Sequence, residues 1–269
     1  MLLSIDGFGI AFRRYDGLLH HRVVPVLEAL SFTIDRGQVL GLVGASGAGK
    51  SLVAHALFGI LPPNAVLTGS ISIGGIEIGA LGEGKLTGCR MGLVPQSPSH
   101  LDPLVRCGRQ LAWAATRSGH ELPKAAIGAL LESFGLEAAV ARLYPYQLSG
   151  GMARRLMLAM ATVGEPDLIV ADEPTSGLDP DNAAIVLRHL RRLADAGKAV
   201  LLITHDLAHA LPYTDRVALL RDGGLVGIED ARAFSGDGSR LETPYARHLW
   251  RAMPQNEFQL ETAAYARSA

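Results

Sequence analysis

The sequence has few cysteines, no long apolar run and no excess of one charge. Its two cysteines, Cys89 and Cys107, lack metal-ligand spacing, so we expect reduced thiols in a cytosolic protein rather than a disulfide framework. No run approaches the roughly 18 apolar residues of a membrane-spanning helix. In MLLSIDGFGIAFRR the basic residues follow the apolar part, which is the wrong order for a signal peptide. Any role at a membrane would therefore need a membrane-bound partner.

The charges nearly balance, with 25 basic and 26 acidic residues. This balance indicates neither a nucleic-acid-binding surface nor an acidic disordered tail. A chain of 269 residues allows one large α/β domain or two modest ones, either with a substantial core.

Three short apolar runs, VLGLVG, DLIVAD and AVLLIT, predict strands buried on both faces of a parallel sheet. Between the last two, DPDNAAIVLRHLRRLADAG has helical periodicity. Asp179 can cap this helix, Pro180 suits its first turn, and Gly197 can end it. These segments predict a strand-helix-strand unit.

Two other regions differ from this pattern. GSISIGGIEI predicts two strands joined by a hairpin turn at Gly74 and Gly75. Residues 97–165 have no strong strand pattern and predict a mostly helical insertion. We expect one domain over residues 1–230, followed by a tail over 231–269 with a single apolar patch, TPYARHLWRAMP.

The stretch GASGAGKS, residues 44–51, matches G-x-x-x-x-G-K-[ST] at every fixed position. Small residues let backbone N–H groups surround a phosphate, and the helix that follows adds its N-terminal N–H groups. Lys50 can reach the β and γ phosphates, and the Ser51 hydroxyl can bind Mg²⁺. The alternative is a glycine-rich turn with a stray lysine. The predicted nucleotide-binding residues here are Gly44, Ala45, Ser46, Gly47, Ala48, Gly49, Lys50, Ser51 and Leu52.

A second acidic motif, LIVADE, ends a predicted buried strand in Asp172 and Glu173. Unpaired buried charge is costly, so two acids there indicate a cation or water nearby. Asp172 would help to hold Mg²⁺, and Glu173 would polarise the attacking water as general base.

The pattern HDLAH, with His205 and His209 four residues apart, resembles the zinc-binding motif H-E-x-x-H. A zinc hydrolase would need Glu at Asp206 and a third ligand. Because His205 ends a predicted strand, an ordinary helical role for His209 is the better interpretation.

LSGGM, residues 148–152, follows the phosphate motif by about 100 residues and precedes Asp172-Glu173 by about 20. Taken alone it predicts only a helix capped by Ser149. With its neighbours it resembles the signature of ATP-binding-cassette (ABC) ATPases. Gln96 matches the glutamine of the Q-loop, SGLD at 176–179 matches the D-loop, and His205 matches the switch histidine.

The resemblance implies an α/β fold of the ABC ATPase type, namely a P-loop NTPase (RecA-like) core with an antiparallel β subdomain and a helical insertion. It implies ATP and Mg²⁺ as cofactors and a head-to-tail dimer with a second ATPase. Ser149, Gly150 and Gly151 would contact the partner's ATP. Gln96 would sense Mg²⁺ and the γ-phosphate, and His205 would help to orient water. The implied catalytic residues are Glu173, His205, Gln96 and Lys50. The implied Mg²⁺ ligands are Ser51, Gln96 and Asp172.

Two positions depart from the family pattern. Met152 follows LSGG where many members have Gln. No clear tyrosine stands where the family stacks an aromatic residue on adenine. His21 is nearest to that place and Tyr15 lies further upstream, and an exposed histidine without a ligand is the alternative for His21.

GILPPNAVLTGSI, YPYQLSGGM and TPYARHLWRAMP resemble segments of the importer branch for dipeptides, oligopeptides and nickel. Met152 favours its nickel or metal-chelate group. That branch implies two membrane permeases and an extracytoplasmic solute-binding protein as further partners, a peripheral location on the cytoplasmic face of the inner membrane, and no nucleic acid. Residues 97–108 are the predicted permease contact or, equally, an ordinary surface loop.

Two other functions are alternatives to a transport ATPase. One is a soluble ATPase clamp for nucleic acid or ribosomes. The other is a nucleotide-dependent scaffold that hardly hydrolyses ATP, and the presence of Glu173 and His205 argues against it.

Overall fold

The computed structural model describes residues 1–16, 20–78, 90–253 and 256. The strands are β1 Leu3–Asp16, β2 His20–Ile34, β3 Val39–Gly44, β4 Ala65–Ile73, β5 Ile76–Ile78, β6 Met91–Val94, β7 Leu168–Asp172, β8 Ala199–Thr204, β9 Arg216–Arg221 and β10 Gly224–Asp230. The α-helices are α1 Lys50–Leu57, α2 Cys107–Arg117, α3 Lys124–Ser133, α4 Gly150–Thr162, α5 Pro180–Asp195, α6 Leu207–Ala210 and α7 Pro244–Arg251.

Five strands form the parallel half of the sheet, in the order β9-β3-β8-β7-β6. Every residue of β3, β7 and β8 is buried. Helices cover this sheet, so a strand buried on both sides carries apolar residues without alternation. The three predicted buried strands are therefore confirmed.

The other half of the sheet is antiparallel, in the order β5-β4-β1-β2. A short parallel pairing of β2 with β10 joins the halves into one ten-stranded sheet among the described residues. Gly74 and Gly75 link β4 to β5 with φ of 60° and 83°, which are values that glycine adopts without strain. The predicted hairpin is confirmed.

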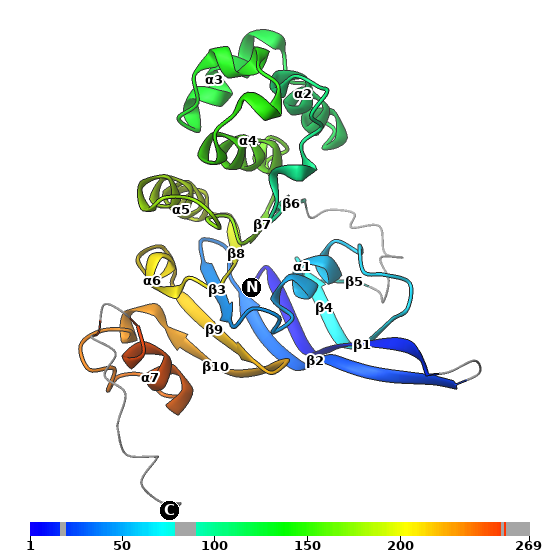
Figure 1. Cartoon of the computed structure of the whole chain (residues 1–269), viewed down its shortest axis with the longest axis vertical. Coiled ribbons are helices and arrows are strands. Elements are labelled where there is room, and N and C mark those ends of the chain that lie inside the picture. Colours follow the sequence, from blue (N-terminus) through cyan, green and yellow to red (C-terminus); the bar gives the residue numbers. More distant parts are fainter. Residues whose placement is uncertain (17–19, 79–89, 254–255, 257–269) are drawn as a thin grey trace, which may run out of the picture.

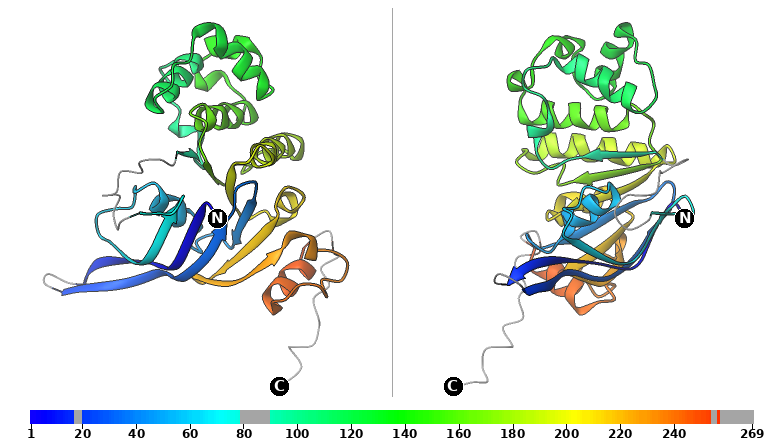
Figure 2. Two further views of the ribbon diagram at one scale, coloured as in Figure 1. Left: turned by 180° about the vertical axis from the view of Figure 1, so that it is seen from behind. Right: turned by 90° about the vertical axis from the view of Figure 1, so that its right-hand side faces the viewer.

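The helical insertion rises from one edge of the sheet, beyond β6 and β7 (Figure 1). It contains α2, α3 and α4, and all three lie within the interval 97–165. Leu111, Leu131 and Leu156, one from each helix, are fully buried in a single cluster. Figure 2 shows α4 and α5 at the junction between this insertion and the sheet.

Helix α5 begins and ends at the predicted residues. Asp179 accepts a hydrogen bond from the backbone N–H of Asn182 at 3.0 Å, and Pro180 is the first helical residue. Gly197 lies just past the end of the helix with φ 88°.

The described residues that follow β10, 231–253, pack on the sheet. The division of the chain into a domain over 1–230 and a tail over 231–269 stays a prediction. Phe234 and Trp250 share a buried cluster with Val217 and Leu219 of β9. Glu229 is 2 % exposed, and its carboxylate accepts hydrogen bonds from the backbone of residues 242 and 243 and from the Thr243 hydroxyl, at 2.8–2.9 Å. Thr243 in turn caps α7, so this carboxylate holds the start of the helix.

Candidate nucleotide site

The predicted site residues follow strands that end at the same edge of the sheet. Val43 of β3 pairs with Thr204 of β8, and the residue before Thr204 pairs with Asp172 of β7. Val94 of β6 pairs with the residue before Asp172. The phosphate loop, Glu173, His205 and Gln96 therefore all begin at one edge, although they come from four distant parts of the chain. Ligands of open α/β sheets bind at this edge.

The phosphate loop depends on its glycines for space and conformation. Gly47 and Gly49 have φ of 83° and 92°. A Cβ at Gly44 would lie 2.4 Å from the carbonyl oxygen of Leu220, so only glycine fits there. Gly49 is the N-cap of α1, and no described side chain caps this helix, so the N–H groups of Lys50 and Ser51 can meet an anion.

Lys50 is the first residue of α1, and its side chain is 7 % exposed. Its Nζ donates to the carbonyl oxygens of Gly44 and Ala45 at 2.9 and 3.0 Å, and lies 4.0 Å from Glu173 Oε1. The ammonium is thus held by its own loop beside a buried carboxylate. It supplies positive charge where the loop would receive phosphate oxygens.

Ser51 and Asp172 bring two oxygen donors together, and the Ser51 hydroxyl donates to Asp172 Oδ1 at 3.1 Å. Burial raises the pKa of Asp172; the hydrogen bond from Ser51 opposes this rise, and the charge of Glu173 adds to it. A partly buried, oxygen-only pair fits a hard divalent cation such as Mg²⁺, which would also compensate the carboxylate charge.

Glu173 is buried, and it adopts a left-handed conformation with φ 48°, which costs a non-glycine residue roughly 1–2 kcal/mol. Its N–H donates to the Ile203 carbonyl at 2.8 Å, which fixes the turn. Its Oε2 lies 2.8 Å from His205 Nδ1, and the imidazole is 59 % exposed. The carboxylate therefore stands between a buried ammonium and a histidine open to solvent.

Gln96 lies two residues beyond β6 and is exposed. It makes no recorded contact with Ser51 or Asp172 within the described residues. Its role as a Mg²⁺ ligand stays a prediction. Ser51 and Asp172, by contrast, lie within hydrogen-bond distance of each other.

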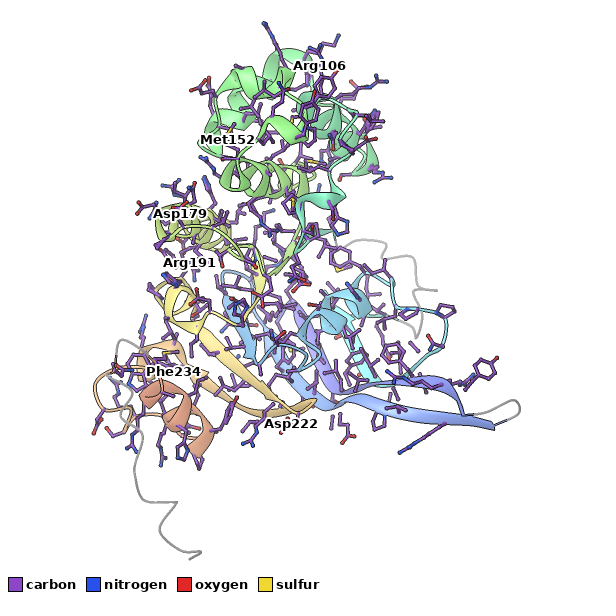
Figure 3. The ribbon with its side chains drawn as sticks, in the orientation of Figure 1. Arg106, Met152, Asp179, Arg191, Asp222 and Phe234 are labelled. Carbon is purple, nitrogen blue, oxygen red and sulfur yellow. The ribbon has the colours of Figure 1, made fainter. Side chains whose placement is uncertain are left out.

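The two signature glycines have different surroundings. Ser149 caps α4 by accepting a hydrogen bond from the Met152 N–H at 3.2 Å, as predicted. Gly150 is exposed, whereas Gly151 is buried and packs on α5. A Cβ at Gly151 would lie 2.6 Å from Asn182 Oδ1. Figure 3 accordingly shows Met152 of α4 and Asp179 before α5 on the same side of the molecule.

The adenine contact is the least supported of the predicted residues. Tyr15 and His21 are cross-strand partners near the turn of the β1–β2 hairpin. The part of β2 that contacts the phosphate loop is Val26–Leu27, because the Leu27 side chain lies against Gly49. The side chain of His21 lies outside the described residues, and its contact with adenine stays a prediction.

Arg154 of α4 was not predicted from the sequence. It is buried, and it donates to the carbonyl oxygens of Pro95 at 3.1 Å and Ser176 at 3.4 Å. Those residues belong to the Gln96 loop and to the turn after Glu173. The one available signal was its spacing, because it follows Gly151 by three residues and precedes the buried Leu158 by four.

The other residues with metal-binding chemistry have ordinary partners. His209 Nδ1 pairs with Asp206 at 2.7 Å, so His205 and His209 point to different carboxylates. Cys107 is a buried free thiol whose pKa is raised by burial, and Cys89 lies outside the described residues. No helix in the described ranges is both long and apolar enough to cross a bilayer.

The profile described as ABC transporter matches residues 27–176. This interval contains the phosphate loop, the signature and the Asp172-Glu173 pair. The chain belongs to the ABC transporter family. It is an ABC ATPase, so the predicted fold class and the family resemblance are confirmed.

Curated relatives of this ABC ATPase include transporters of two kinds. The chain is 36 % identical to Nod factor export ATP-binding protein I of Rhizobium etli over 243 positions, covering 83 % of this chain and 74 % of the relative. It is 33 % identical to dipeptide transport ATP-binding protein DppD of Bacillus subtilis over 268 positions, covering 94 % and 77 %. It is 35 % identical to oligopeptide transport ATP-binding protein OppD of Lactococcus lactis subsp. cremoris over 271 positions, covering 95 % and 77 %.

Solved structures agree with this assignment. An ATP-binding subunit of an ABC transporter superposes with a TM-score of 0.70 at 28 % identity, covering 87 % of this chain and 92 % of that one. The dimeric cassette MJ0796 with ADP and Pi superposes with a TM-score of 0.71 at 23 % identity, covering 86 % and 99 %, which shows the fold.

Proposed function

We propose that this ABC ATPase powers the import of a di- or oligopeptide, nickel or a metal chelate through partner permeases. The length of the alignments supports import. The two peptide-transport relatives reported above align over 94–95 % of the chain, and the export relative over 83 %. The additional coverage favours the peptide-transport relatives over the exporter.

In this proposal each residue at the sheet edge has a chemical task that its geometry supports. Lys50 neutralises the β and γ phosphates of ATP, and the loop N–H groups orient them. Ser51 and Asp172 would hold Mg²⁺, with Gln96, two residues beyond β6, as a further ligand. When bound, Mg²⁺ supplies positive charge that stabilises the triphosphate in the transition state.

Glu173 accepts the proton of the attacking water. The proposal of hydrolysis depends mainly on the contact of this carboxylate with His205. Its carboxylate is buried and is positioned by the 2.8 Å hydrogen bond with His205. A base so constrained loses little entropy when it meets its water. His205, exposed on its other side, contacts the γ-phosphate and helps to orient that water.

A second ATPase subunit completes each site. Ser149, Gly150 and Gly151 contact the partner's ATP, and the exposed Ser149 and Gly150 begin α4, where the helix dipole favours an anion. The burial of Gly151 leaves its backbone N–H, rather than its Cα, as the group that serves the nucleotide. The partner is a copy of this chain or a different ATPase.

The permease docks in a groove of about 890 Å³ between the helical insertion and the sheet. His100, Leu101 and Asp102 line it and belong to the predicted contact segment 97–108. The half-exposed Trp113 and the partly exposed Met160 supply an apolar, adaptable surface for a permease helix. This segment begins just after Gln96, so docking and phosphate sensing share one stretch of chain.

In this role the protein would lie on the cytoplasmic face of the inner membrane, beside two permeases. An extracytoplasmic solute-binding protein selects the substrate and contacts this chain only indirectly. The printed names of relatives favour peptides, whereas Met152 favours nickel or a metal chelate.

The direction of transport tests the proposal. Cells lacking the gene are complemented with the wild type or with Glu173→Gln, and uptake of labelled dipeptide and of ⁶³Ni is measured. We expect the wild type alone to restore accumulation of one substrate, and the protein to sediment with membranes only when its permeases are present. Increased accumulation in the deleted strain would indicate export, and co-purification with nucleic acid or ribosomes would favour the clamp.

A further inference from the structure

Arg154 is a buried cation whose recorded partners are neutral. Its exposed fraction is 6 %, and the ion pairs of the described residues do not include it. Burial lowers its pKa, and no carboxylate opposes that effect. Buried charge without a counterion is costly, so its position needs an explanation beyond packing.

The guanidinium links two loops that are far apart in sequence. Nη1 donates to the carbonyl of Pro95, the residue before Gln96. Nη2 donates to the carbonyl of Ser176, whose own N–H donates to the Glu173 carbonyl at 3.2 Å. One planar group with rigidly spaced donors thus fixes both the Gln96 loop and the turn that carries Glu173.

The same residue belongs to the helix that begins at the signature. Ser149 and Arg154 lie about 7 Å apart along the axis of α4, at 1.5 Å per residue. The tip of α4 also rests on α5, because Gly151 packs against Asn182. A displacement of either loop therefore reaches the helix tip through a short and rigid connection.

We propose that Arg154 is a positioning residue that couples the two phosphate-facing loops of this subunit to the signature tip of α4. When Gln96 and Glu173 contact the ATP bound by this subunit, the helix tip moves to the position in which Ser149 and Gly150 contact the ATP bound by the partner subunit. The inference rests on the roles proposed for Gln96 and Glu173. The contacts that it uses are those of Arg154 itself.

Hydrogen exchange on the full chain tests this coupling. Arg154→Met keeps an unbranched side chain and removes the donors. Exchange should rise roughly tenfold or more at the amides of residues 96–101 and 176–178, because losing a hydrogen bond from a charged donor shifts an opening equilibrium by that much. The buried strand β7 should not change. Arg155→Met is the matched control, because Arg155 donates only to Gly151 and Gly135 within the described residues.

Nucleotide binding gives the second readout. In a Glu173→Gln background at a concentration where the protein is monomeric, Mg-ATP should protect residues 44–52 in both the Arg154 and the Arg154→Met forms. Protection of residues 149–154 should appear only with Arg154. When Glu173 is left unchanged, Arg154→Met should lower kcat relative to the wild type and leave KM unchanged. Absent protection at 44–52 would overturn nucleotide binding itself, which is a separate failure.

Two results would overturn the coupling. One is unchanged exchange at both loops in Arg154→Met, and the other is a uniform rise that includes β7. Arg154→Lys provides a second variant if the Met form folds poorly. Its single nitrogen cannot span both carbonyls, so only one loop should stay protected, and protection of both would contradict the bridging role.

Discussion

Gly151→Ala separates the packing role of the signature from its nucleotide role. The new Cβ would lie 2.6 Å from Asn182 Oδ1 and 2.8 Å from its Cγ. Asn182 cannot move aside freely, because its Nδ2 donates to Asp179 Oδ2 at 2.7 Å in the cap of α5. The substitution must therefore separate α4 from α5 or break that cap.

The expected cost follows from two opposing effects. Overpacking costs roughly 1–3 kcal/mol, and replacing glycine by alanine in a helix returns about 0.5–1 kcal/mol. We expect a net loss of about 1–2 kcal/mol in the free energy of unfolding. The melting temperature should fall by about 2–4 °C for each kcal/mol in a chain of this size.

Thermal unfolding of four variants measures this. Asn182→Ala removes the clashing atoms, so the Gly151→Ala/Asn182→Ala double variant should recover most of the loss, with a coupling of about 1 kcal/mol. Gly150→Ala is the matched control, because its Cβ would lie 3.6 Å from Leu178, an ordinary contact. It should keep stability and lower ATP turnover. An unchanged melting temperature for Gly151→Ala, or no recovery in the double variant, would refute the reasoning.

Three further variants test other contacts. Glu173→Gln should lower ATP turnover about 10²–10⁴-fold, or roughly 3–5 kcal/mol in the barrier, while ATP binding persists; phosphate release within threefold of wild type would contradict its role as base. Because the pKa of Asp172 is raised in the folded protein, its ionised form lowers stability at pH 7. Asp172→Asn should therefore raise the melting temperature of the nucleotide-free protein at pH 7, and this gain should vanish below the unfolded pKa of about 3.9. The same substitution should weaken Mg²⁺-dependent nucleotide binding. In a Trp113→Phe background, Glu229→Ala should shift the fluorescence emission of Trp250 to the red. The substitution removes hydrogen bonds worth about 1.5–3 kcal/mol each that hold the start of α7. An unshifted spectrum would argue against this role of Glu229.

Local patterns predicted the elements that local physics determines. The glycines of the phosphate loop, the Gly74–Gly75 hairpin and the cap at Asp179 are short-range features, and each lies where it was predicted. The buried strands were recognisable because a parallel strand leaves a continuous apolar run.

Long-range contacts were outside the reach of these patterns. In ARRLMLAMA only helical spacing distinguishes Arg154, which is buried, from Arg155, which reaches the carbonyl of Gly135. The tail was predicted as weakly patterned, yet residues 242 and 243 donate hydrogen bonds to Glu229 of β10, and Trp250 shares a buried cluster with Val217 and Leu219 of β9. The adenine contact stays a prediction, since strand register decides which side chain of β2 reaches the phosphate loop.

The catalytic edge draws on residues 44–51, 96, 172–173 and 205, so it forms only after β8 has joined the sheet. A nascent or truncated chain that stops before residue 205 holds the phosphate loop but not its histidine. Saturating nucleotide would select the finished topology, stabilising it by about 2.7 kcal/mol at a hundred times Kd. Cellular ATP would then act as a folding checkpoint as well as a fuel.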